Sequence, residues 1–159
     1  MATLIGANLS LAQSGTTDGK SAGVGDRLES HDGNVYVYVQ ASGAITQYDV
    51  VIMDEDWTAV RASTTTSASA FGQKCGVVQA TLADDEYGWV LVYGTGNFRV
   101  KSSGVINAAL NTTGSAGVLD DDGTTGSETI NDIYLTTAGS TGTTNKEGIL
   151  NFPTVGTTN

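Results

Sequence analysis

The chain has 159 residues, and its 17 acidic and 7 basic side chains give a formal net charge of −10. This length allows one domain with its own core, and the negative charge excludes nucleic acid and anionic membranes as expected partners. A single cysteine, Cys75, excludes an intrachain disulfide, and no apolar run is long enough to span a bilayer.

The composition favours β-structure. Gly, Thr, Ser and Ala dominate, whereas Lys, Arg and Glu, which are common in helices, are scarce. Val, Ile, Thr and Tyr fill the ordered-looking segments, and these residues suit a pleated, half-buried surface. Residues 1–11 lack the charged and long apolar segments of a signal peptide, so we expect a soluble protein made inside the cell.

Residues 1–34 are predicted to form an extended N-terminal arm, and residues 35–159 a β-domain. The arm carries Leu4, Ile5, Leu9 and Leu11, followed by the Gly- and Ser-rich stretch SGTTDGKSAGVGD. A segment with so little apolar surface does not offset its own ordering entropy and needs a partner surface.

The β-domain begins with VYVYVQ (35–40), in which Val35, Val37 and Val39 share one face, while Tyr36 and Tyr38 share the other. A strand that is apolar on both faces needs cover on both faces. Residues 44–63 follow, with two β-branched runs around the acidic triplet 54–56, which predicts a hairpin. The low-complexity stretch 64–70 is predicted to be a surface loop.

Further strands are predicted at 73–81, 104–110, 116–119, 128–138 and 148–152, with turns or loops at 83–88, 120–128 and 139–148. The stretch EYGWVLVYGTGNFRVKS (86–102) is predicted to be a hairpin that turns at Gly94-Thr95-Gly96. Short strands at this spacing predict an all-β fold, either an antiparallel β-sandwich or a β-barrel, preceded by the arm.

No catalytic or metal-binding constellation emerges from the residue pattern. His31 is the one histidine and lies in a polar turn, and no motif links it to Cys75 as a nucleophile. The acidic triplets 54–56 and 120–122 fit water-exposed turns, since the calcium-loop pattern fails at Val118 and Thr129. We therefore expect no enzyme activity, no cofactor and no metal.

The aromatic face of residues 87–93 leaves two interpretations open. Tyr87, Trp89 and Tyr93 alternate along the predicted strand and suit either the interior of a sheet or a stacking platform for sugars. Burial of all three is expected of a structural protein, and exposure in a groove is expected of a glycan-binding adhesin. Trp57, at the acidic turn, is expected to be the most exposed aromatic residue, either as an interface anchor or packed across its hairpin.

Four separated patches resemble small structural proteins of tailed bacteriophages. They are GNVYVYVQASGAITQYDVVIMDED, EYGWVLVYG, AGVLDDDGTTGSETINDIYLTTA and EGILNFPTVG, spread in order over residues 33–156. The resemblance is to head decoration, or cement, proteins, which are β-rich, often trimeric, and bind the outside of the capsid.

The resemblance implies a virion protein that stabilises the expanded shell by bridging neighbouring subunits of the major capsid protein, without catalysis. It implies a homo-oligomer, with a trimer favoured, made in the bacterial cytoplasm and placed on the outer capsid surface. The alternative is a tail, fibre or adhesin domain that binds host glycans. Candidate contacts with the capsid or another subunit are Leu4, Ile5, Leu9, Leu11, Tyr36, Tyr38 and Trp57.

Overall fold

The computed structural model describes residues 7–15, 20–101 and 104–158, and within these residues it is all-β apart from one helical turn. All strands belong to one sheet by hydrogen-bonded pairing, and two of the pairings, β3–β5 and β7–β9, are parallel. The all-β prediction is confirmed, whereas an antiparallel sandwich or barrel is not confirmed by this single mixed sheet. The strands are β1 (Gln13–Ser14), β2 (Arg27–Glu29), β3 (Val35–Ala41), β4 (Val50–Met53), β5 (Thr58–Arg61), β6 (Lys74–Val78), β7 (Glu86–Val100), β8 (Leu110–Thr112), β9 (Leu119–Asp120), β10 (Glu128–Leu135) and β11 (Thr144–Thr158).

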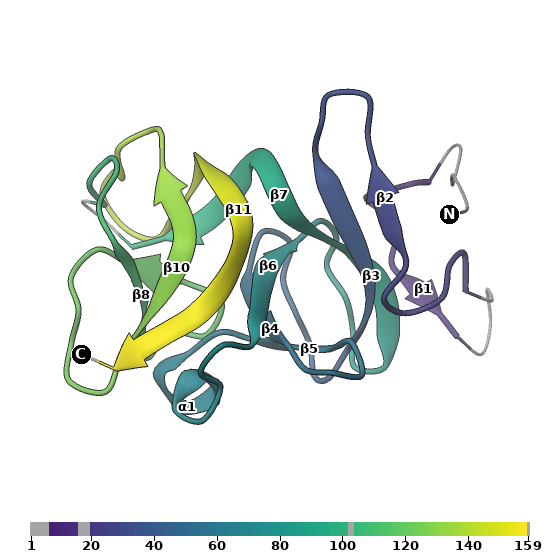
Figure 1. Ribbon diagram of the computed structural model, residues 1–159, viewed down its shortest axis with the longest axis horizontal. Coiled ribbons are helices and arrows are strands. Elements are labelled where there is room, and N and C mark those ends of the chain that lie inside the picture. Colours follow the sequence, from purple (N-terminus) through teal and green to yellow (C-terminus); the bar gives the residue numbers. More distant parts are fainter. Residues whose placement is uncertain (1–6, 16–19, 102–103, 159) are drawn as a thin grey trace.

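Strand β7 pairs with strands in both halves of the molecule. Its first half pairs with β3 and with β6, and its second half pairs with β11 and, at Val100, with β9. Figure 1 shows β7 passing from the group of β3 to β6 into the group that contains β8, β10 and β11. One long strand therefore belongs to both halves of the structure.

The pairings close on themselves twice. In the first ring of strands, β3 pairs with β5, β5 with β4, β4 with β6, and both β6 and β3 with the first half of β7. In the second ring, β11, β10, β8 and β9 connect one side of the second half of β7 to the other. Closed pairing leaves few strand edges open to pairing with another chain.

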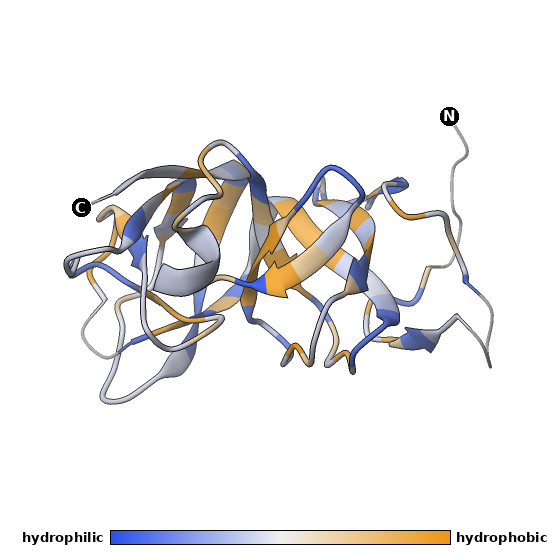
Figure 2. Ribbon diagram, turned by 90° about the horizontal axis from the view of Figure 1, so that it is seen from below, coloured by the Kyte–Doolittle hydropathy of each residue, from blue (hydrophilic) through white to orange (hydrophobic). Residues whose placement is uncertain are grey.

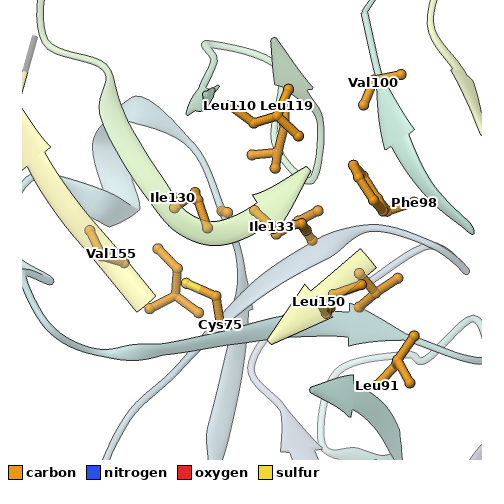
Figure 3. Close-up of a cluster of buried hydrophobic side chains, with 14 of the residues drawn as sticks. Cys75, Leu91, Phe98, Val100, Leu110, Leu119, Ile130, Ile133, Leu150 and Val155 are labelled. Atoms are coloured by element: carbon orange, nitrogen blue, oxygen red, sulfur yellow. The ribbon is translucent and has the colours of Figure 1, made fainter. Parts of the chain in front are cut away.

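Two buried apolar clusters follow the period-two alternation of the strands. Val37 and Val39 of β3 and Val90 and Val92 of β7 belong to one cluster, and the residues between them belong to the other. The prediction that residues 35–40 are covered on both faces is thus confirmed. Figure 3 shows part of the larger cluster, which combines side chains of the first ring, such as Cys75, with side chains of the second ring, such as Ile130 and Leu150. In Figure 2 the hydrophobic residues concentrate on the central strands.

The hairpin predicted for residues 86–102 is wrong, because β7 runs straight through Gly94, Thr95 and Gly96 as one strand. The Asn34 side chain accepts a hydrogen bond from the Thr95 amide at 2.9 Å and donates one to the Thr95 carbonyl at 3.1 Å. It lies where a Cβ on Gly94 would be, and Gly94 has a φ of +108°. Glycine here allows a close approach of Asn34 and does not reverse the chain.

Two further local predictions need correction. The surface loop predicted at 64–70 contains the helical turn α1 (Thr64–Ser67), which begins at a capping box formed by Ser63 and Thr66. The short strand predicted at 148–152 is the middle of β11, which starts within the predicted loop 139–148 and continues past Pro153. The predicted hairpin in 44–63 is confirmed, since β4 and β5 pair across the acidic turn.

Several described residues of 1–34 pack against the larger cluster, which contains Tyr38 and Trp89. Strand β1 pairs with β7 through Gln13 and Tyr87, and the Tyr38 hydroxyl donates to Gln13 Oε1 at 2.6 Å. Strand β2 pairs with β3, and Leu28 packs against the larger cluster. The division into an arm and a domain stays a prediction, but residues 7–15 and 20–34 contact the sheet of their own chain.

Candidate functional site

The aromatic stretch on β7 is core for most of its length. Trp89 is 1% exposed and its ring centroid lies 5.0 Å from that of Tyr38, on which the Tyr87 ring is also stacked with 6.1 Å between centroids. Tyr93 differs, since it is 40% exposed at the point where β7 passes Gly94. Tyr87 and Trp89 therefore offer no open ring face on which a sugar would stack.

The structure places the predicted contact residues in three environments. Tyr36 and Tyr38 are buried in the larger cluster. Leu9 and Trp57 are half-buried, and Leu11 is 47% exposed. The expectation that Trp57 is the most exposed aromatic residue is wrong, since Phe71 is 77% exposed. Leu4 and Ile5 lie outside the described residues. The contact role of all seven stays a prediction.

The residues considered for catalysis do not form a reactive group. Burial raises the pKa of the Cys75 thiol to about 12, so the thiolate is suppressed at neutral pH. His31 lies in an exposed turn, where the Ser30 hydroxyl donates to the Asp32 carboxylate and lowers the pKa of Asp32. A buried thiol and a water-exposed histidine are not arranged as a nucleophile and its base.

The acidic turns use their carboxylates on their own backbone. Asp54 Oδ1 accepts hydrogen bonds from the amides of Asp56 at 3.0 Å and Thr58 at 2.8 Å, and Glu86 Oε2 accepts one from the Ala83 amide at 2.7 Å. Over residues 7–15, 20–101 and 104–158, no three His, Cys, Asp or Glu side chains gather as a metal site would require. In the same residues, no helix is long and apolar enough to cross a membrane.

A surface groove lies at one end of the first ring, between that ring and β11. Its volume is about 360 Å³, within the roughly 300–1,000 Å³ typical of ligand pockets. We name it the Trp57–Phe152 groove after its two aromatic residues. Its lining includes Arg27, Val37, Trp57, Lys74, Val92 and Phe152.

Each aromatic residue of the groove has a cation over its ring. Lys74 Nζ lies 4.4 Å from the Trp57 ring centroid, and the Arg27 guanidinium carbon lies 5.2 Å from that of Phe152. The Tyr93 ring also stacks on Phe152, with 5.2 Å between ring centroids. Cations over ring faces are held by the negative potential of the π-system, which keeps them at the groove.

Both aromatic residues occupy left-handed backbone conformations. Trp57 has a φ of +64° at the β4–β5 turn, and Phe152 has a φ of +53° in β11. Phe152 lies where the pairing of β10 with β11 shifts register, between Asn131↔Thr154 and Ile133↔Leu150. The backbone of Gly25, without a Cβ, lets the Trp57 indole lie directly against it.

The sequence pattern identified Trp57 in this groove and missed Phe152, Arg27 and Lys74. One usable signal was Pro153, the only proline, which follows Phe152 in a segment otherwise typical of a strand. Proline within a strand marks an edge or a bulge, where a side chain is redirected. Nothing local to Arg27 or Lys74 marks either residue, since their neighbours in the groove come from other strands.

No protein-family model matches this chain, and no curated protein matches it significantly.

Proposed function

We propose that this protein is a structural virion protein that decorates the outer surface of a tailed-bacteriophage capsid and stabilises the expanded shell. In this role it bridges neighbouring subunits of the major capsid protein, acts without catalysis, and forms a homo-oligomer, with a trimer favoured. The basis is the resemblance of residues 33–156 to head decoration proteins, together with the placement of the aromatic residues.

The observation that carries the proposal is the burial of Tyr87 and Trp89 inside the protomer; the third aromatic residue expected to be buried, Tyr93, is 40% exposed. An adhesin that stacks sugars on this strand needs these rings at the surface, whereas a structural protein uses them as core. The exposed ring of Phe152 already has Tyr93 and Arg27 against it, so it is a poor platform for a sugar.

Two further features suit a protein present in many copies on one particle. The closed rings of pairing cover strand edges, which limits edge-to-edge association between crowded neighbours. The net charge of −10 opposes aggregation and binding to nucleic acid. A ligand that binds only the expanded lattice stabilises that lattice by mass action, so a structural role needs no chemistry.

The test is cosedimentation of the purified protein with expanded and unexpanded capsids of the phage that encodes it. We expect saturable binding to expanded shells only, and light scattering of the free protein is expected to give a trimer mass. Absence of binding to both shells, with retention on a glycan array, would replace this proposal with the adhesin alternative.

A further inference from the structure

The geometry points to the Trp57–Phe152 groove as the binding site for an extended acidic segment of a partner protein, with apolar side chains next to its carboxylates. The inference deepens the proposed function, on which the identity of that partner as the capsid protein rests. The preference of the groove for an acidic peptide rests on the groove alone.

Trp57 and Phe152 both have left-handed backbone conformations. Left-handed backbone is uncommon outside glycine, asparagine and aspartate, and bulky side chains adopt it at a cost in stability. Four other non-glycine residues have positive φ: Asp85, Asn107 and Asp132 are of the tolerant type, and Tyr48 is a third aromatic residue, which packs against the larger cluster and does not line the groove. Two of the three aromatic residues with positive φ therefore line this one groove, with their rings directed to the same surface.

The groove carries two positive charges, on Arg27 and Lys74. Among the described residues, salt bridges engage Arg61, Arg99 and Lys101, whereas Lys20, Arg27, Lys74 and Lys146 form none, and two of these four, Arg27 and Lys74, line the groove. Asp26 precedes Arg27 in sequence, and Asp54 follows Met53, which pairs with Lys74, but neither carboxylate forms a salt bridge with these cations. The groove therefore presents two cations that no carboxylate within 4.0 Å neutralises, in a protein whose net charge is −10.

Apolar side chains also line the groove that holds these two cations. Val37 and Val92 line the groove from β3 and β7, and the Trp57 and Phe152 rings line it from the β4–β5 turn and β11. A carboxylate pairs with the planar guanidinium of Arg27 or the ammonium of Lys74, and an aliphatic side chain fits the valines. The net charge of −10 makes binding of an acidic segment less favourable on the rest of the surface.

The probe is a capped, fluorescein-labelled peptide of alternating leucine and aspartate, compared with a peptide in which asparagine replaces every aspartate. Binding is followed by fluorescence anisotropy and by the indole N–H signal of Trp57 in ¹H–¹⁵N spectra, assigned with Trp57→Phe. We expect the acidic peptide alone to bind and to shift this signal, and its affinity to fall as salt is raised.

Matched variants test the assignment. Lys74→Gln and Arg27→Gln are each expected to weaken binding of the acidic peptide about tenfold, as loss of a charge-assisted hydrogen bond does. Lys146→Gln is the control. Lys146 lies on β11 in the second ring, and its substitution changes the net charge by the same amount. Phe152→Asn removes the ring and introduces a residue that tolerates positive φ. It is expected to weaken binding while the protein stays folded.

Equal binding of both peptides, no binding of the acidic peptide, or an equal loss in Lys146→Gln would overturn the inference. A Trp57 shift with sialyllactose and none with the acidic peptide would overturn it in favour of an anionic glycan. If the groove variants sediment with expanded capsids like the unmodified protein, the groove is not the capsid contact, although the proposed function stands. If the acidic peptide binds but no capsid does, the proposed function fails and the groove assignment stands.

Discussion

The two tryptophans of this protein lie in opposite environments. Trp89 is buried between Tyr38 and the rest of the larger cluster, in regular strand conformation. Trp57 is half-buried at a turn, in left-handed conformation, with a lysine over its ring. Residue type alone does not distinguish core from binding surface. The distinguishing features are burial, backbone conformation and the charge of the nearest neighbour.

The largest expected effect is at the core member of this pair. Trp89→Ala removes a fully buried ring and is expected to lower the free energy of unfolding by about 3–5 kcal/mol. Trp57→Ala is expected to cost about 1–2 kcal/mol, since its ring is only half-buried. Urea denaturation of both variants measures the difference. Equal losses would mean that Trp57 is a core residue and not part of a surface site.

Asp49 and Asp56 form a similar pair, in which one carboxylate is buried and the other is exposed. The fully buried Asp49 carboxylate accepts from Arg99 Nη1 at 2.7 Å and lies 3.8 Å from Arg61 Nη1. Asp49→Asn is expected to lower the free energy of unfolding by about 3 kcal/mol, the lower end for a broken buried ion pair, because both arginines reach water. The control, Asp56→Asn in an exposed turn, is expected to change it by less than about 0.5 kcal/mol.

The accessibility of the Cys75 thiol shows whether this residue belongs to the core or to the groove. It adjoins the groove, yet its side chain is 1% exposed and burial raises the pKa of its thiol to about 12 from 9.0. The unfolded chain loses this proton at lower pH than the folded protein, so stability contributed by Cys75 falls as pH rises above about 9. The slope is at most about 1.4 kcal/mol per pH unit.

The measurement is the pH dependence of unfolding for the protein and for Cys75→Ala, between pH 8 and pH 10, with the difference assigned to Cys75. Iodoacetamide at pH 8 is expected to leave the folded thiol unmodified. Rapid alkylation would place the thiol in the groove and not in the core.

The smallest effect on stability is expected at Phe152. Phe152→Asn removes the ring stacked on Tyr93, which is worth about 0.5–1.5 kcal/mol, but relieves a bulky residue of its positive φ. We expect a net change in the free energy of unfolding below about 1 kcal/mol. A much larger loss in thermal denaturation would show that Phe152 serves the fold and weaken its assignment to the groove.

The sequence by itself determined the features that depend on neighbouring residues. Its scarcity of helix-forming side chains and its alternation in 35–40 and 87–93 predicted an all-β protein, and the alternation in 35–40 predicted a strand covered on both faces. The acidic triplet 54–56 predicted the β4–β5 turn, where Asp54 caps the backbone amides. Each of these follows from local propensity, period-two patterning or turn chemistry.

Only the tertiary structure decided the features that join distant residues. Gly94-Thr95-Gly96 has the composition of a turn, but Asn34, 61 residues away from Thr95, fills the space beside Gly94 and the strand continues. The Trp57–Phe152 groove likewise combines residues of β2, β6 and β11 with a turn. These contacts depend on strand pairing and register, and pairing between distant segments is set by how the whole sheet buries its two faces.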